Sequence, residues 1–241
     1  MDKNELVKLI IDGMRRTLVH YGFWFNEAIH QFGFEEAEKM EKTAWENGFK
    51  IIMKRLSKIL GFEIDEDGVP IVLKEKSEEE LKKILEGVAA NWLANDGVWF
   101  QAIEFPNGIN DAKRTNDSCW TKFSPFEAKK IKELLNLGEN PGLEGLKKAL
   151  QYRMYAFINR WSIEKPDDKT LIFRMNDCRV QSARKRKGLP DYDCKTAGLV
   201  EYIFFAKTID SRIKTECICC PPDNHPEEYY CAWKFTIKDE G

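Results

Sequence analysis

The fold of the C-terminal part of the chain is decided by the stretch Ile213-Lys-Thr-Glu-Cys-Ile-Cys-Cys-Pro-Pro-Asp-Asn-His-Pro-Glu-Glu-Tyr-Tyr-Cys-Ala-Trp-Lys-Phe-Thr-Ile237. Two strand-like runs, 213–220 and 229–237, flank a turn-rich loop, and this pattern predicts an antiparallel hairpin with a long loop. Successive side chains of a strand point to opposite faces. Cys217, Cys219 and Cys231 are therefore predicted to point together toward the layer beneath the sheet, whereas Cys220 faces elsewhere.

The concentration of thiols in this part of the chain indicates a functional site. Six of the seven cysteines lie in the last third of the sequence, and four of them lie between 217 and 231. In a reducing compartment, clustered cysteines favour a metal site, a redox site or a nucleophile over structural disulfides. Burial as small apolar side chains is the alternative.

The predicted metal ligands are the three inward thiols and a fourth partner. Cys217, Cys219 and Cys231 form the inner face, Cys178 is the first choice for the fourth ligand, and His225 on the loop is the second. Thiolates with a nearby imidazole suit zinc or an iron–sulfur cluster. The Cys-x-Cys-Cys spacing matches neither a zinc ribbon nor a ferredoxin run, so a reactive thiol and buried structural thiols stay open.

A basic segment follows Cys178 directly, Arg179-Val-Gln-Ser-Ala-Arg-Lys-Arg-Lys187. It is interpreted as an anion clamp in which Arg179 or Arg184 holds a carboxylate or phosphate of a ligand. A solvated basic turn is the alternative. The formal net charge of −2 argues against a general binder of nucleic acid or anionic membranes.

The remaining C-terminal sequence predicts one further strand and a helix. Residues 169–178 alternate apolar and polar side chains as a half-buried strand does, and 194–210 carry apolar residues at helical spacing. The fold class is therefore α+β, with a small antiparallel sheet of three strands and one or two helices in a cysteine-rich region, 164–241. Residues 1–163 are predicted to be mostly helical.

The helical region contains an internal duplication. When the chain is shifted by 75 residues, Gly22-Phe-Trp-Phe-Asn26 aligns with Gly97-Val-Trp-Phe-Gln101, and without a gap Trp45 meets Trp120. Tryptophan is rare, so two matched tryptophans in one register indicate two copies of a helix–break–helix unit, about 15–62 and 90–137.

Several local signals predict where the helices begin and end. Ser77 and Glu80 are spaced as a capping box, and Gly61 is a helix stop. Gly138 is predicted to stop the second copy in the same way. Pro125 is predicted to open a new helix, and the apolar spacing predicts another helix over about 142–160.

Composition places the chain among ordinary folded proteins. It has 241 residues, of which 43% are hydrophobic and 32% charged, far from the composition of disordered chains. No apolar run approaches the roughly 18 residues of a membrane span, and the start, Met1-Asp-Lys-Asn-Glu5, lacks a signal-peptide core. A cytoplasmic location is predicted.

The sequence resembles two groups of proteins. Arg15-Arg-Thr-Leu-Val-His-Tyr-Gly22, Asn95-Asp-Gly-Val-Trp-Phe-Gln101, Asp117-Ser-Cys-Trp120, 178–188 and 217–235 resemble an uncharacterised family from anaerobic prokaryotes usually labelled "cytosolic protein", over nearly the whole chain. The terminal Cys-x-Trp-x-Phe is similar to the ending of 4-vinyl reductase domains and of hydrolases of 2-amino-thiazoline-4-carboxylate. That likeness covers about the last 70 residues, and it implies a small-molecule-binding α+β module with functional cysteines.

These observations predict a cytoplasmic protein that binds a metal or a small ligand in a cysteine-lined site of the C-terminal region. The first alternative is a hydrolase of a small heterocyclic or thio-amide substrate that uses a cysteine nucleophile or zinc-bound water. The second is a non-catalytic interaction or sensor protein with buried structural thiols.

Overall fold

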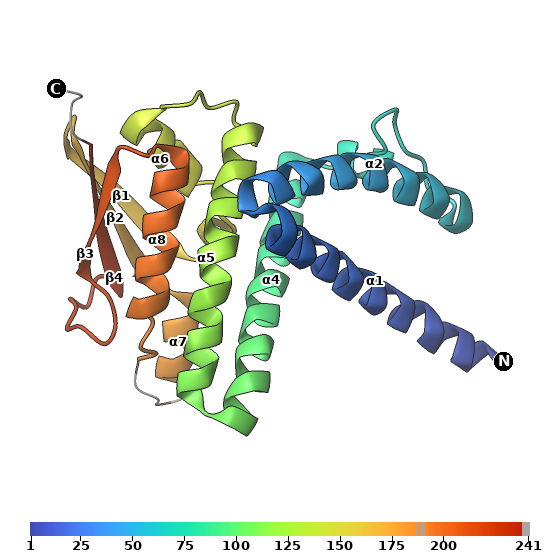
Figure 1. The fold of residues 1–241 in the computed structure, drawn as a ribbon, viewed down its shortest axis with the longest axis horizontal. Helices are drawn as coiled ribbons and strands as arrows, with labels where there is room; N and C mark the ends of the chain where they lie inside the picture. Colours follow the sequence, from blue (N-terminus) through green and yellow to red (C-terminus); the bar gives the residue numbers. More distant parts are fainter. Residues whose placement is uncertain (187, 189–190, 238–241) are drawn as a thin grey trace. The chain divides into compact units, whose positions relative to one another are not determined.

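The computed structural model (Figure 1) describes residues 1–186, 188 and 191–237. The chain divides into two compact units, 1–81 and 82–241. The first unit contains α1 (Lys3–Phe32), α2 (Phe34–Leu60), α3 (Ile71–Lys74) and the start of α4 (Glu78–Asn107). The second contains the rest of α4, followed by α5 (Ile109–Leu134), α6 (Gly142–Leu150), η1 (Met154–Phe157), β1 (Arg160–Asp167), β2 (Thr170–Asp177), α7 (Arg179–Arg186), α8 (Lys195–Ile209), β3 (Ile213–Cys219) and β4 (Cys231–Ile237). The predicted boundary at 163/164 falls inside the second unit and within β1, which begins at Arg160.

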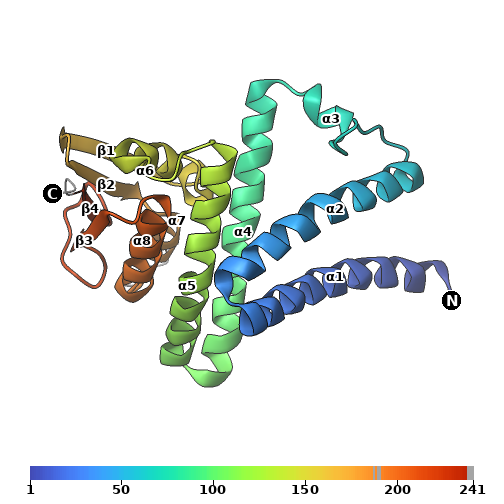
Figure 2. The ribbon, with the colours of Figure 1, turned by 45° about the horizontal axis from the view of Figure 1, so that its top comes forward.

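The first unit is a hairpin of two long helices, which lie side by side in Figure 2. Asp2 caps α1 through a capping box with Glu5, and the chain reverses at Gly33, whose φ of 82° favours glycine. Gly61 ends α2 in the left-handed conformation, as predicted. None of the residues of α1 is buried.

The internal duplication is confirmed and is longer than the sequence match. Helix α4 has 30 residues, as α1 does, and begins 75 positions later. Gly108 repeats the break at Gly33, with φ and ψ of 90° and 163° against 82° and 165°. Ala37 and Ala112, one turn into each second helix, are 0% and 1% exposed. A helix–glycine–helix hairpin therefore occurs twice in the chain.

Several predicted helix ends are confirmed and others are wrong. Ser77 and Glu80 form the predicted capping box at the start of α4. Pro125 does not begin a helix but lies inside α5, because the buried face of α5 runs through it from Trp120 to Ile131. The left-handed residue after α5 is Asn136, not Gly138.

The C-terminal sheet is antiparallel, as predicted, but has four strands in the order β1-β2-β4-β3. The additional strand is β1. The helix predicted over 142–160 ends at Leu150, and a turn and η1 take the place of its second half before β1 begins at Arg160. Strand β1 is an edge strand with Pro166 near its end and little burial, so its sequence lacks the apolar alternation that marks β2.

Helix α8 is the centre of the second unit. It packs between α5 and the inner face of the sheet, which carries Phe173, Trp233 and Phe235 (Figure 1). Gly198 permits this close packing, since a Cβ atom there would lie 2.7 Å from Cζ2 of Trp233. The α+β class and the helices on one face of a small antiparallel sheet are thus confirmed.

A buried ion-pair network joins α5, α8 and the segment before η1. Arg153, 2% exposed, donates from Nε to Glu127 at 2.9 Å, and its Nη1 forms an ion pair with Glu201 at 2.6 Å. Two carboxylates around one guanidinium reduce the cost of burying these charges. Among the residues described, no helix combines the length and apolar character needed to cross a membrane.

Candidate functional site

A cavity of about 410 Å³ lies within the second unit. Its walls come from α4 and α5, from α7 and α8, and from the inner face of the sheet. We call it the thiol cavity, because four cysteines line it, namely Cys178, Cys194, Cys220 and Cys231. Its volume is within the range of small-molecule pockets.

Each of the four thiols comes from a different segment. Cys178 follows β2, Cys194 is the N-cap residue of α8, Cys220 follows β3, and Cys231 begins β4. All four are free cysteines and are buried or half-buried. Residues separated by up to 53 positions thus meet at one wall.

An irregularity in β3 decides which thiols reach the cavity. Cys217 pairs with Trp233, but the next pair joins Cys219 to Ala232, so the register shifts between the two cysteines. The extra residue reverses the alternation after Cys217, as a β-bulge does. Cys219 is therefore not on the face of Cys217 and Cys231, and Cys220 reaches the cavity in its place, so the predicted orientations of Cys219 and Cys220 are wrong.

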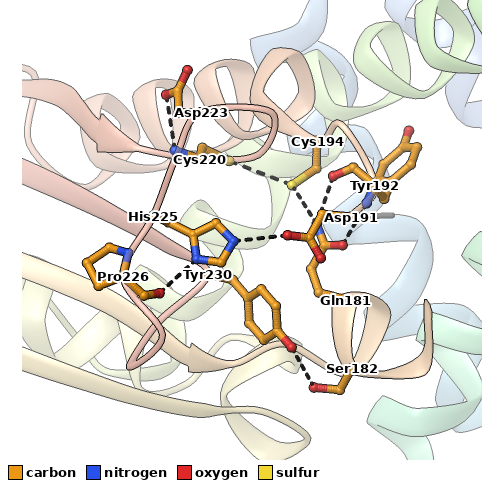
Figure 3. A network of polar contacts seen from close by, with 10 residues as sticks. All are labelled: Gln181, Ser182, Asp191, Tyr192, Cys194, Cys220, Asp223, His225, Pro226 and Tyr230. Atoms are coloured by element: carbon orange, nitrogen blue, oxygen red, sulfur yellow. Dashed lines mark hydrogen bonds and ion pairs between the residues drawn. The ribbon is translucent and has the colours of Figure 1, made fainter. Parts of the chain in front are cut away.

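Cys194 and Cys220 face each other, with their sulfurs 3.6 Å apart (Figure 3). Gln181 Nε2 also donates to Cys194 Sγ, at 3.5 Å. The hydrogen bond from Cys220, supported by that from Gln181, lowers the pKa of Cys194, although burial opposes it. The pKa of Cys220 is raised by its hydrogen bonds to Cys194 and Cys231 and by burial. Cys194 is therefore the thiol of this pair that ionises first.

Gln181 is fixed by a second set of contacts. Its side chain is 1% exposed, and its amide donates to the Tyr192 carbonyl and accepts from the Tyr192 N–H, both at 2.8 Å. These two bonds tie α7 to the segment before α8, and they hold the amide N–H toward Cys194 (Figure 3).

The other walls are mainly aromatic, with a few polar groups. Tyr202 stacks on Trp233 with ring centroids 4.7 Å apart, and Phe100 packs edge-on against Tyr192 at 5.4 Å. The indole N–H of Trp233 is buried and has no hydrogen-bond partner among the described residues. Asp96 of α4 also lines the cavity, and burial raises the pKa of its carboxyl group.

The predicted site residues fall into two groups. Cys178, Cys231 and Arg184 line the thiol cavity. Burial raises the pKa of Cys178 to about 12, so this thiol is held protonated at neutral pH. Cys217, Cys219 and Arg179 belong to the second group, since none of them lines the cavity, and Arg179 is exposed.

His225 also lies outside the cavity lining. Its Nε2 contacts Asp191 at 3.0 Å and its Nδ1 contacts the carbonyl of Pro226 at 2.8 Å (Figure 3). The hydrogen bond to Asp191 raises the pKa of the imidazole. His225 thus anchors its loop to the segment before α8 instead of meeting the thiols.

Besides Cys220, the polar or ionisable residues of the cavity that were not among the predicted site residues include Cys194, Gln181 and Asp96. Cys194 carried a signal, because it is one of the six clustered cysteines and stands at a helix start. Nothing in the sequence distinguished Gln181 and Asp96 from the polar residues next to them. Within the described ranges, no three His, Cys, Asp or Glu side chains are arranged to hold a metal ion.

Comparison with known proteins adds the family. No curated protein and no solved structure matches the chain. A family model matches residues 1–76 and again 74–237, and the two matches meet where the second helical hairpin begins. Together they span nearly all of the sequence, so the chain belongs to a family of unknown function, DUF6125.

Proposed function

We propose that the chain binds a small planar organic molecule in the thiol cavity. The observation that carries this proposal is the convergence of four cysteines from four segments on one aromatic-walled cavity of about 410 Å³. Pockets of this size, mainly apolar with a few placed polar groups, are the usual form of small-molecule sites.

The walls define the chemistry of the ligand. Stacked rings such as Tyr202 and Trp233 favour a flat, polarisable molecule. The buried N–H of Trp233 needs an acceptor, which a heterocyclic nitrogen or a carbonyl would supply. Arg184 at the same cavity supports the predicted anchor for a ligand carboxylate. We therefore propose a planar heterocycle, with an acidic substituent directed to Arg184.

The internal repeat supplies a matched pair of variants to test this. Gly97 lines the cavity, and a side chain there would meet no atom within 4 Å of its Cβ, so Gly97→Phe fills the cavity without a backbone clash. Gly22 is the equivalent position of the first hairpin and is equally open, so Gly22→Phe is the control.

Binding is measured by saturation-transfer NMR with quinoline and quinoline-2-carboxylate as probes. Both probes are expected to bind the wild type and Gly22→Phe, and to lose their signal with Gly97→Phe. The carboxylate is expected to bind more tightly, and Arg184→Gln should abolish that difference. Equal signals from wild type and Gly97→Phe, or none from either, would contradict the proposal.

Zinc or an iron–sulfur cluster at the cysteines stays a prediction. Elemental analysis and a visible spectrum of anaerobically purified protein test it directly. Stoichiometric zinc without colour indicates a zinc site, and brown absorbance indicates a cluster. Protein with neither metal would contradict it.

A further inference from the structure

Two thiols of the cavity lie close together, and the chain segments that carry them are hydrogen-bonded to each other. Cys194 and Cys220 have sulfurs 3.6 Å apart. The N–H of Lys195 donates to the carbonyl of Pro221 at 2.9 Å, and the Lys195 ammonium pairs with Asp223 at 2.7 Å. Asp223 in turn accepts from the N–H of Cys220 at 3.2 Å (Figure 3). The residues beside each cysteine are thus tied together, and the two sulfurs must approach from 3.6 Å to about 2.05 Å to form a disulfide bond.

The two thiols are not equivalent. Cys194 accepts from the rigid Gln181 amide and lies at the N-terminus of α8, where the helix dipole favours an anion. Cys220 is 1% exposed and follows the strand irregularity that turns it inward. Cys194 is half-buried at the cavity, so it is the thiol that an incoming molecule can reach.

We propose that Cys194 and Cys220 form a reversible dithiol–disulfide pair that exchanges with a low-molecular-weight disulfide entering the thiol cavity. This inference is independent of the proposed ligand. Cys194 is the attacking thiol and Cys220 the resolving one. Disulfides in reducing compartments are mostly of this transient, reactive kind.

The exchange has two steps. The Cys194 thiolate attacks one sulfur of the small disulfide RSSR, the S–S bond breaks, and one RS⁻ leaves, which forms a mixed disulfide at Cys194. Cys220 then gives its proton to the departed RS⁻ and attacks the Cys194 sulfur, and the second RS⁻ leaves. The protein pair loses two electrons, and RSSR gains them as one RSH and one RS⁻.

The test uses the full chain, reduced and then equilibrated without oxygen in mixtures of reduced and oxidised glutathione. Free thiols are blocked with N-ethylmaleimide, and the disulfide-linked peptides are mapped by mass spectrometry. One cross-link is expected, between the peptides of Cys194 and Cys220, and dithiothreitol should remove it. No cross-link at the most oxidising ratio, or a link from either residue to Cys178 or Cys231 in its place, would overturn the proposal.

Variants assign the two roles. In Cys220→Ala the mixed disulfide with glutathione is expected to accumulate at Cys194, because the resolving thiol is absent. In Cys194→Ala, glutathionylation of Cys220 should be roughly tenfold slower or more, because that thiol is 1% exposed. Equal rates at the two positions would overturn the assignment.

Cys119→Ser is the matched control, since this exposed thiol lies on α5 outside the thiol cavity. Its disulfide yield should equal that of the wild type. Thermal unfolding followed by circular dichroism shows whether each variant folds. The peptide map of the wild type decides the pairing even if a cavity variant does not fold.

Discussion

Asp210, the residue that ends α8, shows how much one buried carboxylate can fix. Its side chain accepts hydrogen bonds from Nε and Nη2 of Arg212 at 3.0 and 2.8 Å, and from the N–H of Gly142 at 2.9 Å. It is 1% exposed, so these bonds are shielded from water. They connect the end of α8 to the starts of α6 and β3, and hydrogen bonding by Arg212 lowers the pKa of Asp210 to about 2.

The low pKa of Asp210 predicts a loss of stability in acid. A carboxyl group with a lowered pKa in the folded state stabilises the fold above its unfolded pKa of about 4, and this contribution disappears as the pH falls through about 2. It amounts to about 2 kcal/mol. Asp210→Asn should therefore be less stable than the wild type at pH 7 and should lose less stability between pH 4 and 2, as measured by urea unfolding.

The exposed Asp168 provides the comparison for this experiment. Asp168→Asn should follow the acid profile of the wild type. If Asp210→Asn and the wild type lose the same free energy of unfolding between pH 4 and 2, the carboxylate of Asp210 does not carry this effect.

At the scale of elements, the contact between α8 and β4 depends on one glycine. Gly198→Ala would place a methyl group 2.7 Å from Trp233, so the ring and the cavity wall must shift. We expect a loss of about 1–3 kcal/mol in the free energy of unfolding. Gly87→Ala in α4 meets no atom within 4 Å and should stabilise the protein by about 0.5–1 kcal/mol. Thermal and urea unfolding compare the two variants, and equal effects would contradict this account of the packing.

The elements that the sequence predicts well are those with one buried face. Strand β2 shows its alternation because every second side chain enters the core. Strand β1 does not, because an edge strand buries little. The apolar content of α8 predicts a helix but not its buried face, which includes Glu201 while Phe204 is exposed. Two of the four cysteines that line the thiol cavity were among the predicted site residues. Cys178 and Cys231 follow from strand positions, but the choice of Cys220 over Cys219 depends on a register shift that tertiary packing sets and alternation alone cannot reveal.

The two hairpins offer a direct comparison of identical residues in different surroundings. Trp120 on α5 is 4% exposed, whereas Trp45, its equivalent on α2, is 54% exposed. Trp120→Ala should cost about 3–5 kcal/mol of unfolding free energy, because a buried indole leaves a cavity. Trp45→Ala should cost less than about 1 kcal/mol. A similar loss for both variants in urea unfolding would mean that the α2 face is covered in solution.

At the scale of the whole molecule, the two units differ in how much core each contains. The large apolar cluster, from Ala128 to Phe235, lies entirely in the second unit, and α1 has no buried residue at all. The family matches also meet at 74–76, before α4. The second hairpin therefore has a folded partner of its own in α8 and the sheet, while the first hairpin has little core of its own.

This difference predicts separate behaviour for two fragments. Residues 77–241 retain the capping box at Ser77 and the whole apolar cluster, so this fragment should unfold cooperatively on heating. Where the full chain forms the glutathione-dependent disulfide between Cys194 and Cys220, the fragment should form it as well. Residues 1–76 should show helical circular dichroism without a cooperative transition, because long helices that bury little gain little from tertiary packing. Differential scanning calorimetry of both fragments measures this. A sharp transition in 1–76 with none in 77–241 would reverse the assignment of the stable core.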